Sequence, residues 1–398
     1  MFLPVDIFNN CVLNNLFDNF AHNYQLLQMI RRNKEIKKIF IIFLLLLAPP
    51  AFKAQYQPSK DFILAGQGHY GFIIAHHNSV AHLVKGHIFG GELSYIFRTD
   101  GCKPWQQSHN YPEIGFCAVH LYLANPQELG NLDALYPFIN FRLNKPEKKA
   151  SLKLRIGTGL AYISKPFDRL TNPKNNIIGS HVNGFVNIRL HTSIALSSAL
   201  RLDAGVGLSH ASNGAIETPN LGLNMATVNL GLGYTFGNKA CIYNRDTLSK
   251  YERRWYPSVI AVVGFKELET PLGSRYTVTG LQFNLYRRMN HKNSFGGGIE
   301  AAYNEATKAV WADNSVYNPT FSQIIQVGVK AGYAFNVDRL SLPLEFGVYV
   351  FKKQDYNGMF FHRIGFRYMI TKHIMANVTL LTHWAKADYF EWGVGYQF

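Results

Sequence analysis

A histidine and a serine two residues apart supply the residue types of an esterase site. They stand in the segment 208–214, which reads LSHASNG, as His210 and Ser212. A serine hydroxyl is a poor nucleophile until a base takes its proton and a third group holds that base in place. In the segment that leads in, every second residue from Leu200 to Leu208 is apolar. Strand side chains alternate between two faces, so His210 and Ser212 continue the apolar face at the end of a strand.

Asn224 is the candidate for the third group. It shares its parity with the apolar row that runs from Ala226 to Phe236 in the following strand. Antiparallel pairing of the two strands would set it opposite His210 and Ser212. A base, a nucleophile and a group that orients the base would then meet on one apolar face. Such a face would be core in a soluble protein, but the rest of the sequence indicates that it contacts lipid.

About sixteen strand-like segments follow one another between residues 68 and 398, each of about ten residues. Residues 151–162 show the pattern clearly, with leucine and isoleucine on one face and Lys153, Arg155 and glycine on the other. A soluble β-sandwich would place its polar face in bulk water and would have no excess of glycine. The alternation therefore predicts an all-β fold, an antiparallel transmembrane β-barrel of the outer-membrane type. The aromatic chain end at Phe398 is typical of strands in such barrels.

Short turns such as 144–148 alternate with longer connections such as 164–181, which is the asymmetry of outer-membrane barrels. A charged segment at 237–255 separates about eight strands from about eight more, and the two halves end similarly, in GLGYTF and GVGYQF. We interpret this as a weak internal duplication. Eight strands can fill their own interior, so one barrel of about sixteen strands and two tandem eight-stranded barrels are both possible. One continuous barrel is the interpretation adopted at this point.

The N-terminal region has the layout of a secretory signal. A basic stretch and an apolar run occupy residues 31–47, the run is too short to span a bilayer, and cleavage after Ala54 is expected. Met29 directly precedes the basic stretch and is the expected true start; a retained signal anchor is the alternative. The expected organisation has four parts: 1–54, an upstream extension and signal peptide; 55–236, the first barrel half; 237–255, a charged linker; and 256–398, a degenerate second half.

The formal net charge of +15 would suggest nucleic acid as a partner in a cytosolic protein. Export argues against nucleic acid. On an exported membrane protein, a basic surface suits anionic head groups, including phosphorylated glycolipid. General solubilising charge on loops and turns explains the same excess equally well.

Cysteine and histidine patterns predict neither a metal site nor another cofactor. The cysteines form no CxxC pair, and the five histidines between residues 69 and 87 fit no coordination motif. A disulfide between Cys102 and Cys117 is chemically possible in an oxidising compartment and would leave Cys241 unpaired. In the second half, Ala and Lys follow His383 where the first half has Ser and Asn, and strand parity turns His383 inward. That copy is expected to be inactive.

The first half, over about residues 62–236, resembles the lipid A 3-O-deacylases of the PagL type, grouped with the acyloxyacyl hydrolase-like proteins. The specific part is His210-x-Ser212-Asn213-Gly214 followed by Pro219-Asn220-x-Gly222. The resemblance implies that His210 is the general base and Ser212 the nucleophile, and that Asn213, next to Gly214, helps to stabilise the oxyanion. The family has an acid fourteen residues after the histidine, where this chain has Asn224. Glu217, in the connecting loop, is a candidate substitute for that acid.

The resemblance implies a hydrolase in the outer membrane of a Gram-negative bacterium, a serine esterase that removes an ester-linked acyl chain from lipid A. Lipopolysaccharide would be the substrate, and basic loops would hold its phosphates. The alternative is a non-catalytic barrel, porin-like or structural, that keeps the motif as a relic. A carboxylate within hydrogen-bond reach of His210 would favour catalysis. The sequence leaves open which acyl chain leaves and which oligomeric state the protein adopts.

Overall fold

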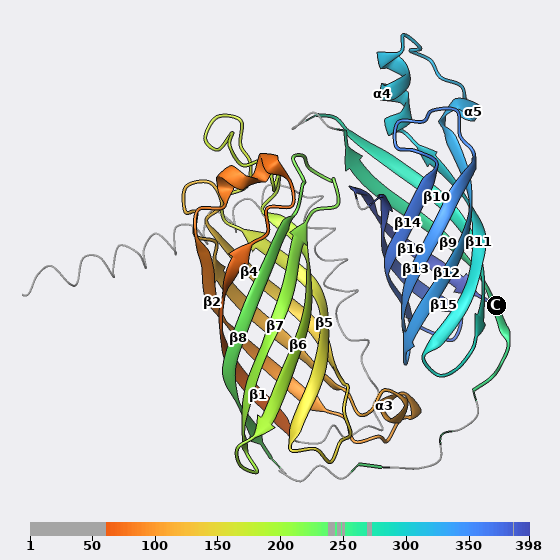
Figure 1. Ribbon diagram of the computed structural model, residues 1–398. Coiled ribbons are helices and arrows are strands. Elements are labelled where there is room, and N and C mark those ends of the chain that lie inside the picture. The colour runs from red at the N-terminus through yellow and green to blue at the C-terminus, as the bar shows by residue number, and fades with distance from the viewer. Residues whose placement is uncertain (1–60, 238–242, 245–247, 249–250, 269–272, 385) are drawn as a thin grey trace, which may run out of the picture. The chain divides into compact units, whose positions relative to one another are not determined.

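The structure is a computed structural model and describes residues 61–237, 243–244, 248, 251–268, 273–384 and 386–398. Within these residues the fold is all-β, and the strands form two closed antiparallel barrels of eight strands each (Figure 1). The expected signal peptide, the start at Met29 and Cys241 lie outside the described residues. None of the described helices has the length and apolarity of a membrane-spanning helix.

The first barrel contains eight strands, one 3-10 helix and one short α-helix. In chain order they are β1 (Phe62–Ile73), η1 (Asn78–Leu83), β2 (His87–Arg98), α3 (Pro104–Ser108), β3 (Glu113–Tyr122), β4 (Asn131–Arg142), β5 (Ala150–Ile163), β6 (Val182–Ala195), β7 (Leu200–Ser212) and β8 (Leu223–Phe236). The connections after the odd-numbered strands gather at one end, which we call the loop end: 74–86, 123–130, 164–181 and 213–222.

The second barrel follows the same plan, with two short helices in one connection. Its elements are β9 (Trp255–Glu267), β10 (Arg275–Arg288), β11 (Asn293–Asn304), α4 (Ala306–Asp313), α5 (Phe321–Ile324), β12 (Ile325–Val337), β13 (Leu340–Phe351), β14 (Phe360–Met369), β15 (Ile374–His383) and β16 (Lys386–Gln397).

Each barrel closes on itself. β1 pairs with β8 over its whole length, from Phe62 opposite Phe236 to Ile73 opposite Met225, and β9 pairs with both β10 and β16. The total of sixteen strands and the barrel class are confirmed, but the single continuous barrel is wrong. Closure after eight strands leaves no open sheet edge in either half, as a membrane-spanning sheet requires.

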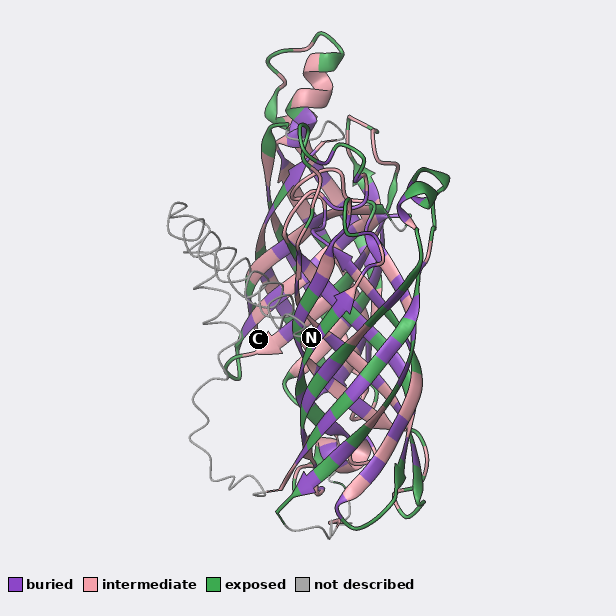
Figure 2. Ribbon diagram, turned by 90° about the vertical axis from the view of Figure 1, so that its left-hand side faces the viewer, coloured by how far each residue is buried: buried purple, intermediate pink, exposed green. Residues whose placement is uncertain are grey.

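The outward and inward faces follow the sequence prediction. Lys153, Arg155 and Asp203 are buried inside the first barrel, whereas Val206 and Leu208 are more than half exposed on its outer surface. Figure 2 shows this alternation as stripes of buried and exposed residues along the strands. Charged residues inside and apolar residues outside are the reverse of a soluble protein, so the outer faces of both barrels are suited to lipid.

Buried ion pairs fill the interior of the first barrel. Glu92 on β2 accepts hydrogen bonds from Arg155 on β5 (3.1 Å) and Arg189 on β6 (2.7 Å), and His69 on β1 lies 3.0 Å from it. In the second barrel Arg363 occupies the corresponding central role and is bonded to three glutamates: Glu300, Glu345 and Glu391. These salt bridges tie together strands that are not neighbours in the sheet, so each barrel interior is a packed polar core.

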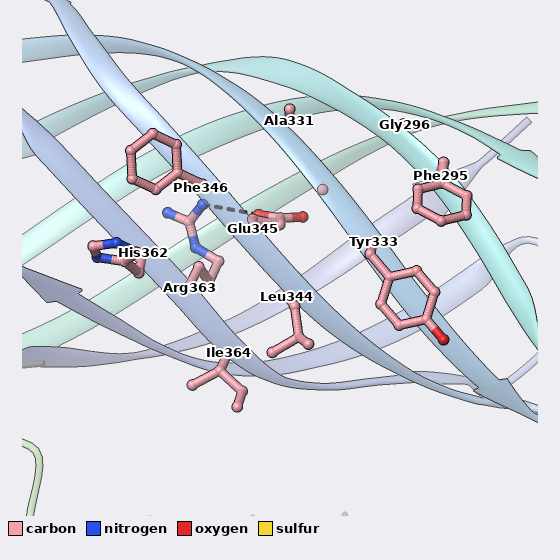
Figure 3. Close-up of a pocket in the computed structure, with 11 residues that line it drawn as sticks. Phe295, Gly296, Ala331, Tyr333, Leu344, Glu345, Phe346, His362, Arg363 and Ile364 are labelled. Atoms are coloured by element: carbon pink, nitrogen blue, oxygen red, sulfur yellow. Dashed lines mark hydrogen bonds and ion pairs between the residues drawn. The ribbon is translucent and has the colours of Figure 1, made fainter. Parts of the chain in front are cut away.

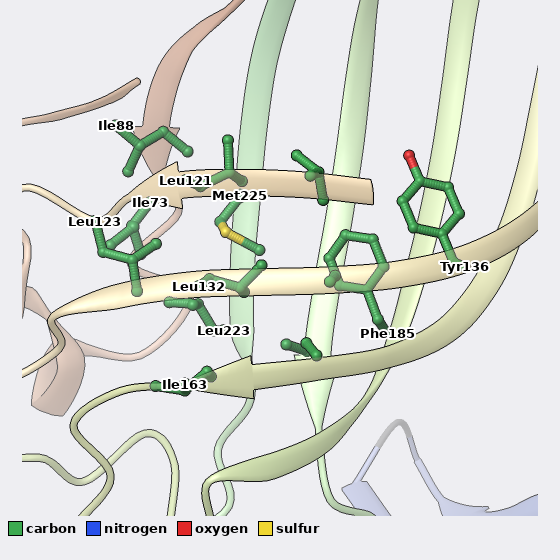
Figure 4. Close-up of a cluster of buried hydrophobic side chains, with 14 of the residues drawn as sticks. Ile73, Ile88, Leu121, Leu123, Leu132, Tyr136, Ile163, Phe185, Leu223 and Met225 are labelled. Atoms are coloured by element: carbon green, nitrogen blue, oxygen red, sulfur yellow. The ribbon is translucent and has the colours of Figure 1, made fainter. Parts of the chain in front are cut away.

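An apolar cluster closes the loop end of the first barrel from inside (Figure 4). Its members at this end project inward from the strand termini: Ile73, Ile88, Leu121, Leu123, Leu132, Ile163, Leu223 and Met225. Close packing of these side chains holds the strand ends in place. The loops and strand ends that carry the candidate catalytic residues therefore stand on a rigid base.

The possible disulfide is not formed. Cys117 lies on β3, buried inside the barrel, while Cys102 lies exposed in the connection between β2 and β3, and no disulfide joins the two. Strand parity explains the difference, because it turns Cys117 away from the connection and into the interior.

Candidate active site

His210 and Asn224 face each other across the β7–β8 pair. The antiparallel register sets the two residues directly opposite, as the sequence predicts, and His210 Nδ1 lies 2.6 Å from Asn224 Oδ1. An amide oxygen has no proton to give, so the imidazole donates its Nδ1–H to Asn224. The lone pair of His210 is therefore on Nε2, where a general base needs it.

Ser212 follows His210 on the same face of β7. In the pairing of β7 with β6, Ser212 lies opposite Gly184 and His210 lies opposite Val186. Two steps along a strand separate the backbone positions by about 7 Å, which two side chains can bridge when they turn toward each other. No hydrogen bond joins the Ser212 hydroxyl to His210 in the described part of the chain. The predicted serine–histidine contact of about 3 Å is thus open in this conformation, as catalytic contacts often are without substrate.

The loop after Ser212 is built by the other residues of the sequence motif. The backbone N–H of Asn213 donates to Asn220 Oδ1 (3.0 Å), and its side-chain amide donates to the carbonyl oxygen of Glu217 (2.9 Å). Gly214 has a φ of +64° and Gly222 a φ of +83°, a backbone region that favours glycine. The Asn-Gly and Pro-Asn-x-Gly parts of the motif thus shape one compact turn at the loop end.

Gly222 lies directly against the candidate base. A Cβ atom at this position would stand 2.6 Å from His210 Cε1, well inside van der Waals contact. The bare backbone of Gly222 and the amide of Asn224 therefore hold the imidazole from two sides.

His76 completes the arrangement and was not assigned a role by the sequence. It lies in the connection after β1, and its Nδ1 is 3.0 Å from Asn224 Nδ2 while its Nε2 is 3.1 Å from the carbonyl oxygen of Leu221. Asn224 is thus bonded to a histidine at each end of its amide. Pairing of β1 with β8 brings His76 here, and no local spacing in the sequence signals a contact of such range.

Two other predicted site residues, Glu217 and Asn213, make hydrogen bonds that differ from those their expected roles require. The carboxylate of Glu217 makes no hydrogen bond to His210 among the described residues, and the backbone oxygen of Glu217 serves the turn instead. The Asn213 side chain donates to Ser180 Oγ (2.8 Å) as well as to Glu217. Their assigned chemical roles, substitute acid and oxyanion donor, remain predictions.

An apolar hollow of about 190 Å³ lies beside His210 on the outer surface of the first barrel. Its walls include the outward side chains of Val186, Ile188 and Leu208, with Ile74 from the loop end. A hydrocarbon chain lying in this hollow would run along the barrel wall and end next to the imidazole. The hollow gives the candidate site an apolar outer wall.

A larger hollow of about 570 Å³ lies on the outer surface of the second barrel (Figure 3). Phe295, Tyr333, Phe346 and His362 lie along it, but no serine or cysteine is among the residues that line it. His383, the counterpart of His210 in the second half, is buried and its Nδ1 bonds the carbonyl oxygen of Phe360. The described part of the second barrel therefore has no second copy of the His210–Ser212 arrangement.

Comparison with protein families gives two adjacent matches. A model described as "Lipid A 3-O-deacylase (PagL)" matches residues 89–233, and one described as "Acyloxyacyl hydrolase, C-terminal domain" matches residues 255–398. A search of curated protein sequences finds no significant match.

Solved structures of barrel proteins are similar at low scores. Neisserial surface protein A has a TM-score of 0.32 at 11% identity, over 44% of this chain and 97% of its own. The Pseudomonas putida toluene transporter TodX has a TM-score of 0.17 at 11% identity, over 89% of this chain and 93% of its own. The siderophore receptor PirA from Pseudomonas aeruginosa has a TM-score of 0.22 at 8% identity, over 86% of this chain and 81% of its own.

Proposed function

The chain belongs to the PagL family of lipid A 3-O-deacylases, and from this premise we propose that it is a serine esterase of the outer membrane that removes an ester-linked acyl chain from lipid A. One observation carries the proposal. A histidine whose Nδ1 is held at 2.6 Å by Asn224 faces outward, beside an apolar hollow, with a serine two residues away on the same strand. An ester at the edge of a lipid leaflet would meet His210 from this hollow, and Ser212 next to it is 7% exposed.

The chemistry would proceed through an acyl-enzyme. The Ser212 oxygen attacks the ester carbonyl carbon while its proton passes to His210 Nε2. The tetrahedral intermediate collapses, the carbon–oxygen bond to the sugar breaks, and the departing alkoxide takes the proton from Nε2. Water, deprotonated by the same nitrogen, then hydrolyses the acyl-serine to release a fatty acid and restore the hydroxyl.

We propose that the oxyanion is stabilised at the start of the turn that follows Ser212. The backbone N–H of Gly214 makes no hydrogen bond within the described residues and is two positions from Ser212. It is free to donate to the developing negative charge, whereas the donors of Asn213 are engaged in shaping the turn.

Asn224 would orient His210 but would bring no negative charge to stabilise its protonated form. A carboxylate at this place would stabilise the imidazolium that forms during catalysis, and a neutral amide does so less well. We therefore expect slower turnover than a carboxylate would give. A non-catalytic barrel that keeps the motif as a relic is the second candidate, and the missing carboxylate is the observation that favours it.

The substrate would bind as part of the outer membrane, with its acyl chain in the apolar hollow. Basic side chains in the loop-end connections of the first barrel offer counter-charges to the phosphates of lipid A: Lys85, Lys165, Arg169 and Lys174. Each lies in a connection on the same side of the barrel as His210.

Mass spectrometry of lipid A from Gram-negative cells with and without the protein tests the proposal. Cells that express the parent protein should lose one ester-linked acyl chain, and Ser212→Ala cells should keep it. Ser209→Ala is the matched control, because Ser209 is on the same strand but points inward, where it accepts a hydrogen bond from Asn187 (2.9 Å). Equal loss of the acyl chain in parent and Ser212→Ala cells would overturn the assignment of Ser212 as the nucleophile. No loss in parent cells would leave the relic barrel as the better interpretation.

A further inference from the structure

We propose that His76 is a positioning residue: it fixes the orientation of the Asn224 amide and so selects the tautomer of His210 that can act as a base. The inference rests on the proposed esterase function and assigns a role to a residue outside the family motif. It follows from a chain of three hydrogen bonds across the loop end of the first barrel.

The first link fixes His76. Its Nε2 lies 3.1 Å from the carbonyl oxygen of Leu221 and its Nδ1 lies 3.3 Å from that of Ile74, and both oxygens can only accept. Because the Leu221 contact is the shorter, we assign the proton of neutral His76 to Nε2. Its Nδ1 then carries a lone pair. The Asn224 amide nitrogen, at 3.0 Å, donates to that lone pair.

The second link fixes Asn224. With its NH2 group committed to His76, the amide must present its oxygen to His210, at 2.6 Å from Nδ1. The third link follows, because His210 must then carry its proton on Nδ1 and its lone pair on Nε2.

The opposite orientation of the amide would disable the base. A carboxylate is the same at both oxygens, but an amide that is turned over presents NH2 to the imidazole. His210 would then accept at Nδ1 and carry its proton on Nε2, and it could not take a proton from Ser212. Asn224 therefore needs a partner that distinguishes its two ends, and His76 is that partner.

Protonation of His76 should reverse the arrangement. A proton on Nδ1 turns this nitrogen into a donor, which faces the carbonyl oxygen of Ile74 (3.3 Å) and repels the NH2 group of Asn224. The amide gains by turning its oxygen to His76. The titratable groups that face His76 are His77 on its own segment, with ring centroids 4.9 Å apart, and His210 on β7. Among the described residues no carboxylate contacts it, so no negative charge there would offset a positive charge on His76.

Two substitutions test the role, measured as kcat/KM for lipid A deacylation against pH in the full-length protein. His76→Leu removes the acceptor and should lower the rate roughly 3- to 10-fold at neutral pH, the effect of losing one hydrogen bond. His76→Asn keeps an acceptor near the position of Nδ1 but cannot be protonated. Its rate at neutral pH should stay close to that of the parent protein.

The acid limb of the pH profile separates positioning from a merely structural role. In the parent protein both His76 and His210 must be neutral, so activity should fall with the square of the proton concentration at low pH. In His76→Asn it should fall with the first power only. A parent profile that already follows the first power would overturn the inference.

A carboxylate at position 224 supplies the internal control. Asn224→Asp has the same shape but can only accept, so His210 keeps the correct tautomer whatever His76 does. In this background His76→Leu should have almost no effect, which is a non-additive double-mutant cycle. An equal loss in both backgrounds would mean that His76 acts through the fold, and the inference would fail. His120→Asn is the matched histidine control, because His120 lies at the same end of the barrel and bonds Asp133 instead (2.7 Å).

Failure of the inference and failure of the proposed function give different results. If the parent protein deacylates lipid A, Ser212→Ala does not, and His76→Leu equals the parent, the function stands and the role of His76 falls. If no variant deacylates lipid A, the tautomer still decides the inference. Nitrogen-15 NMR of histidine-labelled protein, with His210→Ala to assign the signal, should show the proton on Nδ1 in the parent and a shift toward Nε2 in His76→Leu. An unchanged spectrum would overturn the inference.

Discussion

Under the proposed function, Asn224 is the residue on which the chemistry of this site depends most directly. Its oxygen stands 2.6 Å from His210 Nδ1, in the place where a carboxylate would stabilise the imidazolium. Asn224→Asp keeps the shape and adds the charge, so kcat should rise roughly tenfold, the difference between a neutral and a charge-assisted hydrogen bond. Deacylation kinetics on purified lipid A measure this. An unchanged or lower kcat would mean that the charge of the orienting group does not limit the reaction.

Gly222 is a second residue whose size determines the position of His210. Gly222→Ala would place a Cβ atom 2.6 Å from His210 Cε1 and would strain a backbone with φ of +83°. Displacement of the base by about 1 Å should lower kcat by about 100-fold. Gly358→Ala is the control, because Gly358 also has a positive φ, +76°, but has open space where its Cβ would be. Similar losses in both variants would assign the effect to backbone strain instead of contact with His210.

The strands were predictable from the sequence because their signal is local. Alternation in a segment such as 151–162 fixes which side chains face inward, and the β7–β8 register follows from the shared parity of two consecutive strands. The same local reasoning placed Asn224 opposite His210. It could not find His76, because that contact depends on β1 pairing with β8, and it could not choose between one barrel and two for the same reason.

Inside the first barrel, strands β2, β5 and β6 are joined through one carboxylate. Glu92→Ala would leave Arg155 and Arg189 buried with their main partner removed, at a cost of about 3–5 kcal/mol in the free energy of unfolding. Urea unfolding followed by the electrophoretic mobility of the folded barrel measures it. Glu128→Ala is the control: Glu128 lies in a loop and pairs with Lys85, which is nearly half exposed, so the free energy of unfolding should change little. Equal losses would mean that the interior pairs are as solvated as the loop pair.

At the scale of the whole molecule, the two barrels share no strand pairing among the described residues. β1 closes on β8 and β9 on β16, so each barrel contains all of its own ladder hydrogen bonds. Arg363→Ala leaves three buried glutamates of the second barrel without their common partner. The second barrel should then unfold at lower urea concentration, while deacylation at the His210 site keeps its rate. A parallel loss of activity would show that the second barrel supports the site in the first.

The pairing of β1 with β8 also determines the stage of folding at which the site forms. Contacts between the two ends of a long segment form late in folding, because the chain between them must first be ordered. His76 follows β1, and Asn224 lies near the start of β8, where its backbone oxygen accepts from Ile74. Under the proposed function, a chain on its way to the membrane would have His210 and Ser212 together on β7 but would lack the partners that hold the imidazole. Under the proposed function, the enzyme would therefore be dormant in transit and would gain activity only on completed assembly, sparing other esters along its route.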